Sequence, residues 1–382
     1  MLKSCALLSS LLLLVGSACA QGTGLRVLDG STHKPDGTLE DTILVNTSGF
    51  VTSTVFSNQN FYDNYAMGAL DVGIYLTGTP WSFKTQLASD LPHVNRAVIE
   101  YDMRFSSKAE GSVQLGRFAR YNSLYNDATD HPGTFGMDML PMGGYLRREV
   151  LGNFTLMDGI QLQGQALTPL GGLFKARVGY GSGVAGYTNT AQKLFYDYED
   201  PTYKINWGDH DFDISFSYEN GAWTAFTNYN QYKTDIELLD NPTPVAQFVY
   251  GDAKSSTTKL YAVGVRYEQR RYLIEGQLYN RESTTTNALG VEFAGNELKC
   301  GYIGAKVFLS PFSDWRVYGT HSICYNRIYH TEMRDNSVGI SWDKGGRWTG
   351  SLGYHVGSGD GVKPYSTMTD WNVYVLSITR RF

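Results

Sequence analysis

Ionisable side chains recur at every second position in short segments of the sequence, with apolar or aromatic residues between them. Glu100, Asp102 and Arg104 are each separated by one such residue. The same spacing separates Lys175 from Arg177. In an extended strand this pattern places all the charges on one face. Charges of both signs on one polar face attract and orient small ions and dipolar molecules, which is electrostatic selection rather than covalent chemistry.

Groups that support catalysis do not form a recognisable motif. None of the seven histidines lies in a nucleophile and base pattern. His330 lies close to Glu332, but a third metal ligand cannot be placed. The glycine-rich run Gly179–Gly183 ends an expected strand without a following helix, so it lacks the context of a phosphate loop. The sequence therefore predicts no enzyme, no metal and no cofactor.

The first twenty residues have the pattern of a secretory signal peptide. Lys3 precedes an apolar run that ends at Gly16, and small residues follow up to Ala20. We expect export through the Sec pathway and cleavage after Ala20. The alternative is a lipoprotein acylated at Cys19, which Gly16 disfavours because a large aliphatic residue is wanted there.

The rest of the chain keeps one composition throughout. No linker or charge run divides it, so we expect a short N-terminal extension over 21–42 and one domain over 43–382. After the signal no apolar run approaches the roughly eighteen residues that a spanning helix needs. The chain contains 42 glycines and 27 tyrosines, which together with alternating segments favours strands. Its net charge of -5 disfavours nucleic acid as a partner.

Alternation of period two, bounded by turn residues, predicts sixteen strands. They cover approximately 43–57, 69–76, 81–89, 97–105, 112–121, 158–167, 171–181, 209–219, 221–232, 257–268, 271–283, 297–309, 314–325, 336–343, 347–356 and 371–382. An even number is typical of bacterial single-chain membrane barrels. A charge that faces lipid at mid-depth costs about 2–4 kcal/mol, so the charged positions indicate the inner face.

The connections between these strands alternate in length. The longest are 122–157, 182–208 and 233–256. The short ones are Thr77–Pro80, Ser106–Gly111, Thr168–Leu170, Asn220, Gln269–Arg270, Ser310–Ser313 and Lys344–Gly346. Short inner turns and long outer loops are typical of outer-membrane barrels. Five tryptophans lie within about four residues of a short turn, as an inner aromatic girdle requires: Trp81, Trp223, Trp315, Trp342 and Trp348.

The order of these parts resembles the bacterial outer-membrane general porins, which are sixteen-stranded and usually trimeric, over essentially the whole chain after the signal. The resemblance rests on Gly116-Arg117 near the end of the fifth strand, on Leu140-Pro141 in the long third outer loop, and on the terminal Phe382. It implies an all-β transmembrane antiparallel barrel whose third outer loop folds into the lumen. Side chains cannot fill a barrel of this width, so its lumen would hold water.

The resemblance also implies a constriction between bases on the wall and acids on the third outer loop. Separated opposite charges there set up a transverse field that selects solutes by size and charge. The wall bases would be Arg117, Arg104, Lys84, Lys175 and Arg177, and the loop acids Asp127, Asp130 and Asp138. The loop lacks the Pro-Glu-Phe-Gly-Gly-Asp run of the best-known enterobacterial porins, which leaves the individual acids open. The bases could equally be solvated wall residues, and the acids could hold divalent cations that bridge lipopolysaccharide.

We therefore expect a porin of the bacterial outer membrane for passive diffusion of small hydrophilic solutes and ions. The alternatives are a channel specific for a sugar, phosphate or another small anion and, less favoured, a barrel enzyme. Expected partners besides the solutes are outer-membrane lipid and lipopolysaccharide, further copies of the chain in a homotrimer, and the barrel-assembly machinery. That machinery would bind the last strand, where Arg380 replaces the usual bulky residue.

Cys300 and Cys324 flank the turn Ser310–Ser313 symmetrically. In a regular hairpin they face each other on the lumen side at a separation that a disulfide accepts, and an oxidising periplasm permits the bond. The alternative is two unpaired thiols. We predict that neither cysteine of the denatured, unreduced protein is alkylated, and that reduction adds two hydrogens to the intact mass. Alkylation of both residues without reduction would contradict the bond.

Overall fold

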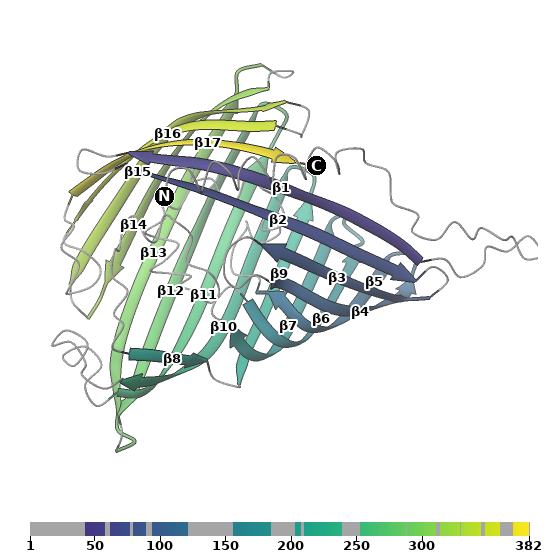
Figure 1. Cartoon of the computed structure of the whole chain (residues 1–382), viewed down its shortest axis with the longest axis horizontal. Coiled ribbons are helices and arrows are strands. Elements are labelled where there is room, and N and C mark those ends of the chain that lie inside the picture. Colours follow the sequence, from purple (N-terminus) through teal and green to yellow (C-terminus); the bar gives the residue numbers. More distant parts are fainter. Residues whose placement is uncertain are drawn as a thin grey trace, which may run out of the picture.

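The computed structural model describes residues 43–57, 62–76, 79–88, 94–120, 156–184, 203–207, 210–238, 253–287, 289–310, 314–328, 330–344, 348–359 and 370–381. Within these ranges no helix is long and apolar enough to cross a membrane. The strands (Figure 1) are β1 (Ile43–Ser57), β2 (Tyr62–Leu76), β3 (Trp81–Ala88), β4 (Val94–Ser106), β5 (Ala109–Ala119), β6 (Leu156–Leu167), β7 (Leu173–Val184), β8 (Tyr203–Trp207), β9 (Asp211–Asn220), β10 (Trp223–Leu238), β11 (Ala253–Glu268), β12 (Tyr272–Asn287), β13 (Glu292–Phe308), β14 (Trp315–Asn326), β15 (Thr331–Lys344), β16 (Trp348–Gly359) and β17 (Asp370–Arg381).

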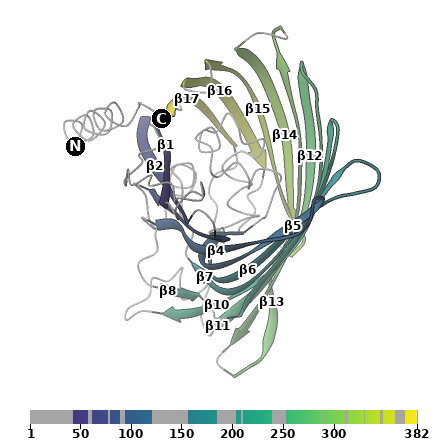
Figure 2. The ribbon, with the colours of Figure 1, turned by 90° about the vertical axis from the view of Figure 1, so that its right-hand side faces the viewer.

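Sixteen of these strands form one closed antiparallel barrel. Neighbours in the chain pair with each other, β7 pairs with β9, and β1 pairs with β17 to close the ring. Figure 2 shows how the strands follow one another around the wall. The sixteen-stranded fold expected from the sequence is confirmed. The short β8, which pairs with β10 beyond the end of β9, was not predicted.

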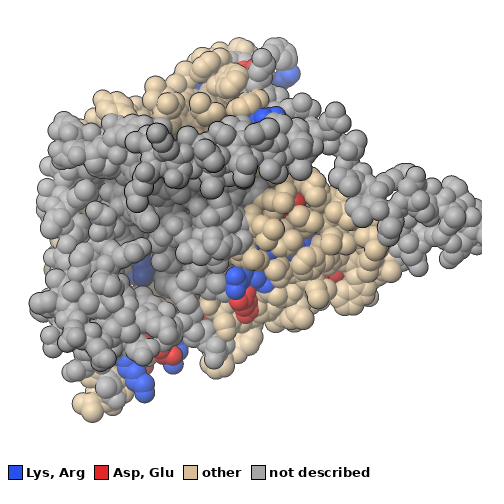
Figure 3. All heavy atoms as spheres, viewed as in Figure 1, with Lys and Arg blue, Asp and Glu red and all other residues tan. Residues whose placement is uncertain are grey.

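Side chains alternate between the outer and the inner face along each strand. On β4, Ile99 and Phe105 are 50% and 68% exposed on the outside, whereas Glu100 is 6% exposed on the inside. On β17, Leu376 lies outside, whereas Ser377 is buried inside. Most described atoms visible in Figure 3 belong to uncharged residues, and the charged ones form a few small groups. The inner face expected for the charged residues of β4 is therefore confirmed.

Aromatic rings line the outer face beside the short turns. Trp81 and Tyr101 have ring centres 4.7 Å apart, and those of Trp223 and Tyr267 lie 4.6 Å apart. Amphipathic rings favour the boundary between lipid and water, so these pairs form the girdle expected there. The charged Arg380 faces outward on β17, with its guanidinium carbon 5.4 Å from the centre of the Trp348 ring. Its charge therefore lies at the interface rather than in hydrocarbon.

Polar outward residues mark the opposite edge of the apolar band. On three neighbouring strands the first polar outward residue lies eight positions along the strand from the boundary residue at the short-turn side. The pairs are Tyr267 and Lys259, Tyr272 and Asn280, and Val307 and Lys299. With a rise of about 3.3 Å per residue and a tilt near 40°, eight positions span about 20 Å along the barrel axis. This height is close to the apolar band of about 25 Å that a membrane barrel presents to lipid.

Val263 lies midway along this band on β11 and is 51% exposed on the outer face. We expect Val263→Lys to lower the free energy of unfolding by about 2–4 kcal/mol, because a charge at mid-depth must leave water. The control Thr257→Lys has the same outward parity but lies beyond Lys259, and should cost about 0–1 kcal/mol. Denaturant unfolding from phospholipid vesicles measures both. Equal costs would place Val263 outside the hydrocarbon.

Candidate functional site: a charged inner wall

Strand register aligns the inward side chains of β4, β5, β6 and β7 into rows that cross the wall. One row consists of Asp102, Ser112, Gln163 and Arg177. The next row toward the short turns consists of Arg104, Glu110, Gln165 and Lys175. Residues far apart in the sequence thus become neighbours.

Two tight turns hold this register. In the β4–β5 turn only two residues lie between Ser106 and Ala109, which pair with each other. In the β6–β7 turn the Thr168 amide donates to the Gly172 carbonyl at 2.8 Å, and Gly171 has a φ of 83°. A glycine accepts this left-handed conformation without the steric cost that other residues meet.

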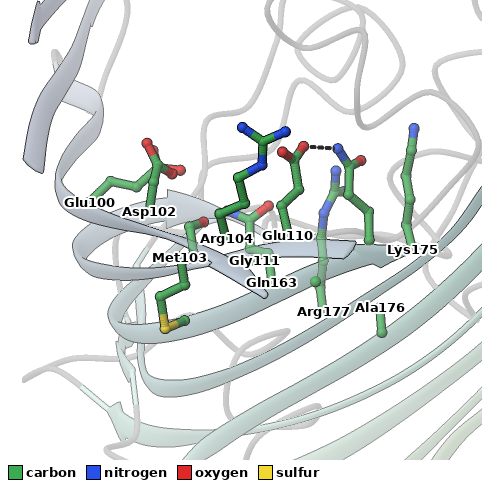
Figure 4. A pocket seen from close by; sticks show the side chains of 13 residues that line it. Glu100, Asp102, Met103, Arg104, Glu110, Gly111, Gln163, Lys175, Ala176 and Arg177 are labelled. Atoms are coloured by element: carbon green, nitrogen blue, oxygen red, sulfur yellow. Dashed lines mark hydrogen bonds between the residues drawn. The ribbon is translucent and has the colours of Figure 1, made fainter. Parts of the chain in front are cut away.

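These side chains line a recess of about 450 Å³. Glu100 and Asp102 lie on one side of the recess and Lys175 and Arg177 on the other, with Glu110 between them (Figure 4). The Glu110 carboxylate accepts a hydrogen bond from the Gln165 side chain. The recess therefore has two carboxylates at one side and two bases at the other, with Arg104, Glu110 and Gln165 between them.

Ion pairs between strands fix the two sides of the recess. The Lys84 ammonium on β3 pairs with the buried Glu100 carboxylate on β4. Lys175 Nζ on β7 lies 2.7 Å from Glu219 Oε1 on β9. Lys84, Lys175, Arg177 and Arg104 all have inward parity, so the structure brings four of the five predicted wall bases to the inner wall.

Arg117 is a correction to the predicted row of bases. It follows Leu115, which is 59% exposed on the outside, by two positions, so it faces outward. Its Nε and Nη2 atoms each lie 2.7 Å from the Asp158 carboxylate oxygens, and Asp158 has the same outward parity. Arg117 lies eight positions from Ala109, at the outer edge of the apolar band. The motif Gly116-Arg117 suggested the wall, but alternation decides the face.

Arg120 is the inward arginine of this segment, and the sequence analysis missed it. Its side chain is fully buried and pairs with the equally buried Asp211 carboxylate, while its Nε donates to the Leu156 carbonyl at 3.3 Å. Asp211 Oδ1 accepts the Lys233 amide at 2.9 Å. The Arg120 guanidinium carbon lies 5.7 Å from the centre of the Tyr232 ring. Counting in twos from the inward Gln114 would have identified it.

The inner wall on β10 to β13 contains apolar and aromatic residues. Leu260 and Leu298 have inward parity and are 0% exposed. Inward tyrosines lie near them at Tyr232, Tyr279 and Tyr302. The described inner wall from β10 to β13 thus carries apolar and aromatic residues beside charged ones such as Arg266 and Glu275.

Cys300 and Cys324 lie directly opposite each other on β13 and β14, with Cα atoms 4.0 Å apart. Both are buried and have the inward parity that the hairpin geometry predicts. The structure places the sulfur atoms within bonding distance. Formation of the disulfide in the protein as produced stays a prediction.

Several predicted features lie outside the described residues: Asp127, Asp130 and Asp138, the third outer loop, the signal peptide over 1–20 and the extension over 21–42. Across the described ranges, no group of three or more His, Cys, Asp or Glu side chains is placed to hold a metal ion. The candidate site is therefore the charged inner wall of β4 to β7.

The fold is that of solved outer-membrane barrels. OmpT of Vibrio cholerae is similar with a TM-score of 0.58 at 10% identity, covering 90% of this chain and 99% of that one. An anion-selective porin from Comamonas acidovorans has a TM-score of 0.58 at 12% identity, covering 89% and 100%. The outer-membrane channel DcaP of Acinetobacter baumannii has a TM-score of 0.57 at 11% identity, covering 89% and 97%. No protein-family model and no curated protein sequence matches the chain.

Arg120→Met should lower the free energy of unfolding by about 3–5 kcal/mol, because it leaves the Asp211 carboxylate buried without its cation. The double replacement Arg120→Met with Asp211→Leu should recover part of this loss, since both charges are removed. Arg327→Met is the control, because the Arg327–Glu297 pair at 2.6 Å is exposed and should contribute about 0–1 kcal/mol. Denaturant titration compares the three. Equal losses for Arg120→Met and Arg327→Met would contradict the buried pair.

Proposed function

We propose that the chain is an outer-membrane porin that forms a water-filled pore for passive diffusion of small hydrophilic solutes and ions, without catalysis. The observation that supports this function best is the combination of a closed ring of sixteen strands with a charged inner wall on β4 to β7. A ring of this size is too wide for its side chains to fill. Charged groups on its inner face keep their hydration only if water reaches them.

The similar solved structures are consistent with this proposal. Two of these proteins are named as a porin and as an outer membrane channel. We infer the same location for this chain, in the bacterial outer membrane after Sec-dependent export, with lipid and lipopolysaccharide around the barrel. Assembly as a homotrimer and insertion by the barrel-assembly machinery through β17 belong to the same proposal.

A channel specific for one class of solute is the second candidate. The inward tyrosines and leucines on β10 to β13 favour it, because aromatic and aliphatic surfaces bind sugar rings and other amphipathic solutes. A sugar that binds there would reduce the ion current in a saturable way at low concentration, whereas a general pore would show no saturable block.

Planar-bilayer recordings in a salt gradient test the pore. We expect large, ohmic and weakly cation-selective conductance steps from the refolded chain. Arg177→Gln should shift the reversal potential toward the value of a cation-selective pore, because it removes a positive charge from the inner wall. The matched change Arg117→Gln should leave the reversal potential unchanged, because Arg117 faces outward.

Absence of conductance from folded, inserted protein would overturn the pore. A shift with Arg117→Gln equal to that with Arg177→Gln would overturn the assignment of the two arginines to opposite faces. Asn replacements of Asp127, Asp130 and Asp138, one at a time, locate any constriction that the third outer loop forms. Replacing an acid that lines the constriction should reduce the cation preference of the pore.

A further inference from the structure

We propose that the recess on β4 to β7 is a binding subsite for short zwitterionic peptides. This inference rests on the proposed pore, because the peptide would reach the recess from the lumen. The recess lies next to the short turns, beside Ser106 and Thr168. Its lining residues all belong to the wall strands β4 to β7.

The recess is lined by charges of both signs. Its lining contains three acids and three bases: Glu100, Asp102 and Glu110, and Arg104, Lys175 and Arg177. An equal number of opposite charges gives little preference for a simple anion or cation. Glu100 and Asp102 lie on β4 at one side and Lys175 and Arg177 on β7 at the other, while Arg104 and Glu110 lie between them (Figure 4). A ligand with an ammonium at one end and a carboxylate at the other matches this arrangement.

The residues between the two sides suit peptide groups. Ser112 and Gln163 lie between Asp102 and Arg177 in one row. A hydroxyl and a carboxamide both donate and accept hydrogen bonds, as a peptide group does. Gln161, in the adjoining row, is buried and extends the same neutral surface. The row thus presents, in order, a carboxylate, two neutral hydrogen-bonding groups and a guanidinium.

The spacing of the strands sets the length of the ligand. β4 and β7 are separated by three strand spacings of about 4.8 Å, or about 14 Å along the wall. The side chains of Asp102 and Arg177 shorten this span by reaching into the recess. An extended peptide advances about 3.3–3.6 Å per residue, so three or four residues place its two termini at the two sides. The recess volume of about 450 Å³ lies within the usual range for sites that hold small organic ligands.

Tripeptides that differ only at their ends test the proposal. The probes are trialanine, N-acetyl-trialanine, trialanine amide and the doubly blocked peptide, used with the full refolded chain in detergent micelles. Ligand-observed saturation-transfer NMR measures binding, and block of the ion current in bilayers measures it independently. We expect trialanine to bind about three- to fivefold more tightly than either singly charged peptide, which is the effect of losing one partly exposed ion pair. Equal binding of all four peptides would overturn the subsite.

Variants of the central row identify the residues. Asp102→Asn should remove the preference for trialanine over N-acetyl-trialanine. Arg177→Gln should remove the preference for trialanine over trialanine amide. The exchange Asp102→Arg with Arg177→Asp keeps the net charge and should restore the preference with the peptide reversed. Gln163→Glu keeps the size of its side chain and should weaken trialanine binding by placing a carboxylate beside the peptide carbonyls. A preference unchanged by all of these variants would overturn the assignment.

The matched control lies on another part of the inner wall. Arg316 pairs with Asp343 at 3.3 Å on β14 and β15, outside the lining of the recess. Arg316→Gln should leave the preference for trialanine unchanged, and its loss there would mean that general lumen charge explains the binding. A barrel that conducts ions but does not prefer trialanine overturns the subsite alone. A folded barrel that binds trialanine but does not conduct overturns the pore and leaves the subsite standing.

Discussion

The need to pair every backbone amide within lipid determines the rest of this structure. Hydrocarbon offers no hydrogen-bond partner, so an extended chain spans a membrane only when its last strand pairs with its first. Here β17 meets β1 over the register Phe50↔Arg381 to Ser57↔Tyr374. Closure with sixteen strands leaves an interior too wide for side chains to fill. Because side chains alternate between faces, every second residue points into that interior. Polar and charged residues are therefore accommodated on the inner face of the closed ring.

The sequence predicted the strands most accurately where one face is apolar and the other polar. Two strands are longer than expected at the end away from the short turns. The strand expected over 69–76 begins at Tyr62, and the strand expected over 336–343 begins at Thr331. Outward residues such as Glu332 and Arg334 are polar in these outer parts, so the alternation that reveals a strand ends at the edge of the apolar band. The strand continues because backbone pairing does not depend on that contrast. The five-residue β8, which pairs with β10 beyond the end of β9, was also missed.

The candidate site was harder to predict because it depends on register between strands. Parity alone separates Arg117 from Arg120, and a count from Leu115 would have assigned both faces correctly. The register of a hairpin also depends on the length of its turn. For Cys300 and Cys324, counting residues outward from the centre of the turn placed the two side by side, as the structure has them. A count about the predicted turn Ser106–Gly111 would not have aligned Asp102 with Ser112, because the register shifts between Arg104 and Ser106. Gln163 could not be aligned either, because the long connection between β5 and β6 fixes no register. Leu260 and Leu298 could not be predicted, because apolar inward residues break the rule on which the prediction rests.

The arrangement of the lumen charges decides how far their field reaches. On β11 and β12, Arg266 lies 3.0 Å from Glu275, and on β14 and β15, Arg316 lies 3.3 Å from Asp343. Two opposite charges in contact cancel beyond a few ångströms, so these pairs stabilise the wall more than they influence a solute. In the recess Asp102 and Arg177 lie three strands apart in one row, and a dipole of that length acts on any molecule between its ends. Mobile ions screen charges over about 8 Å at physiological salt, so the field acts on solutes that enter the recess and fades across the open lumen. Selection by this wall is therefore an effect of close contact, and it depends on the register that holds β4 to β7 side by side.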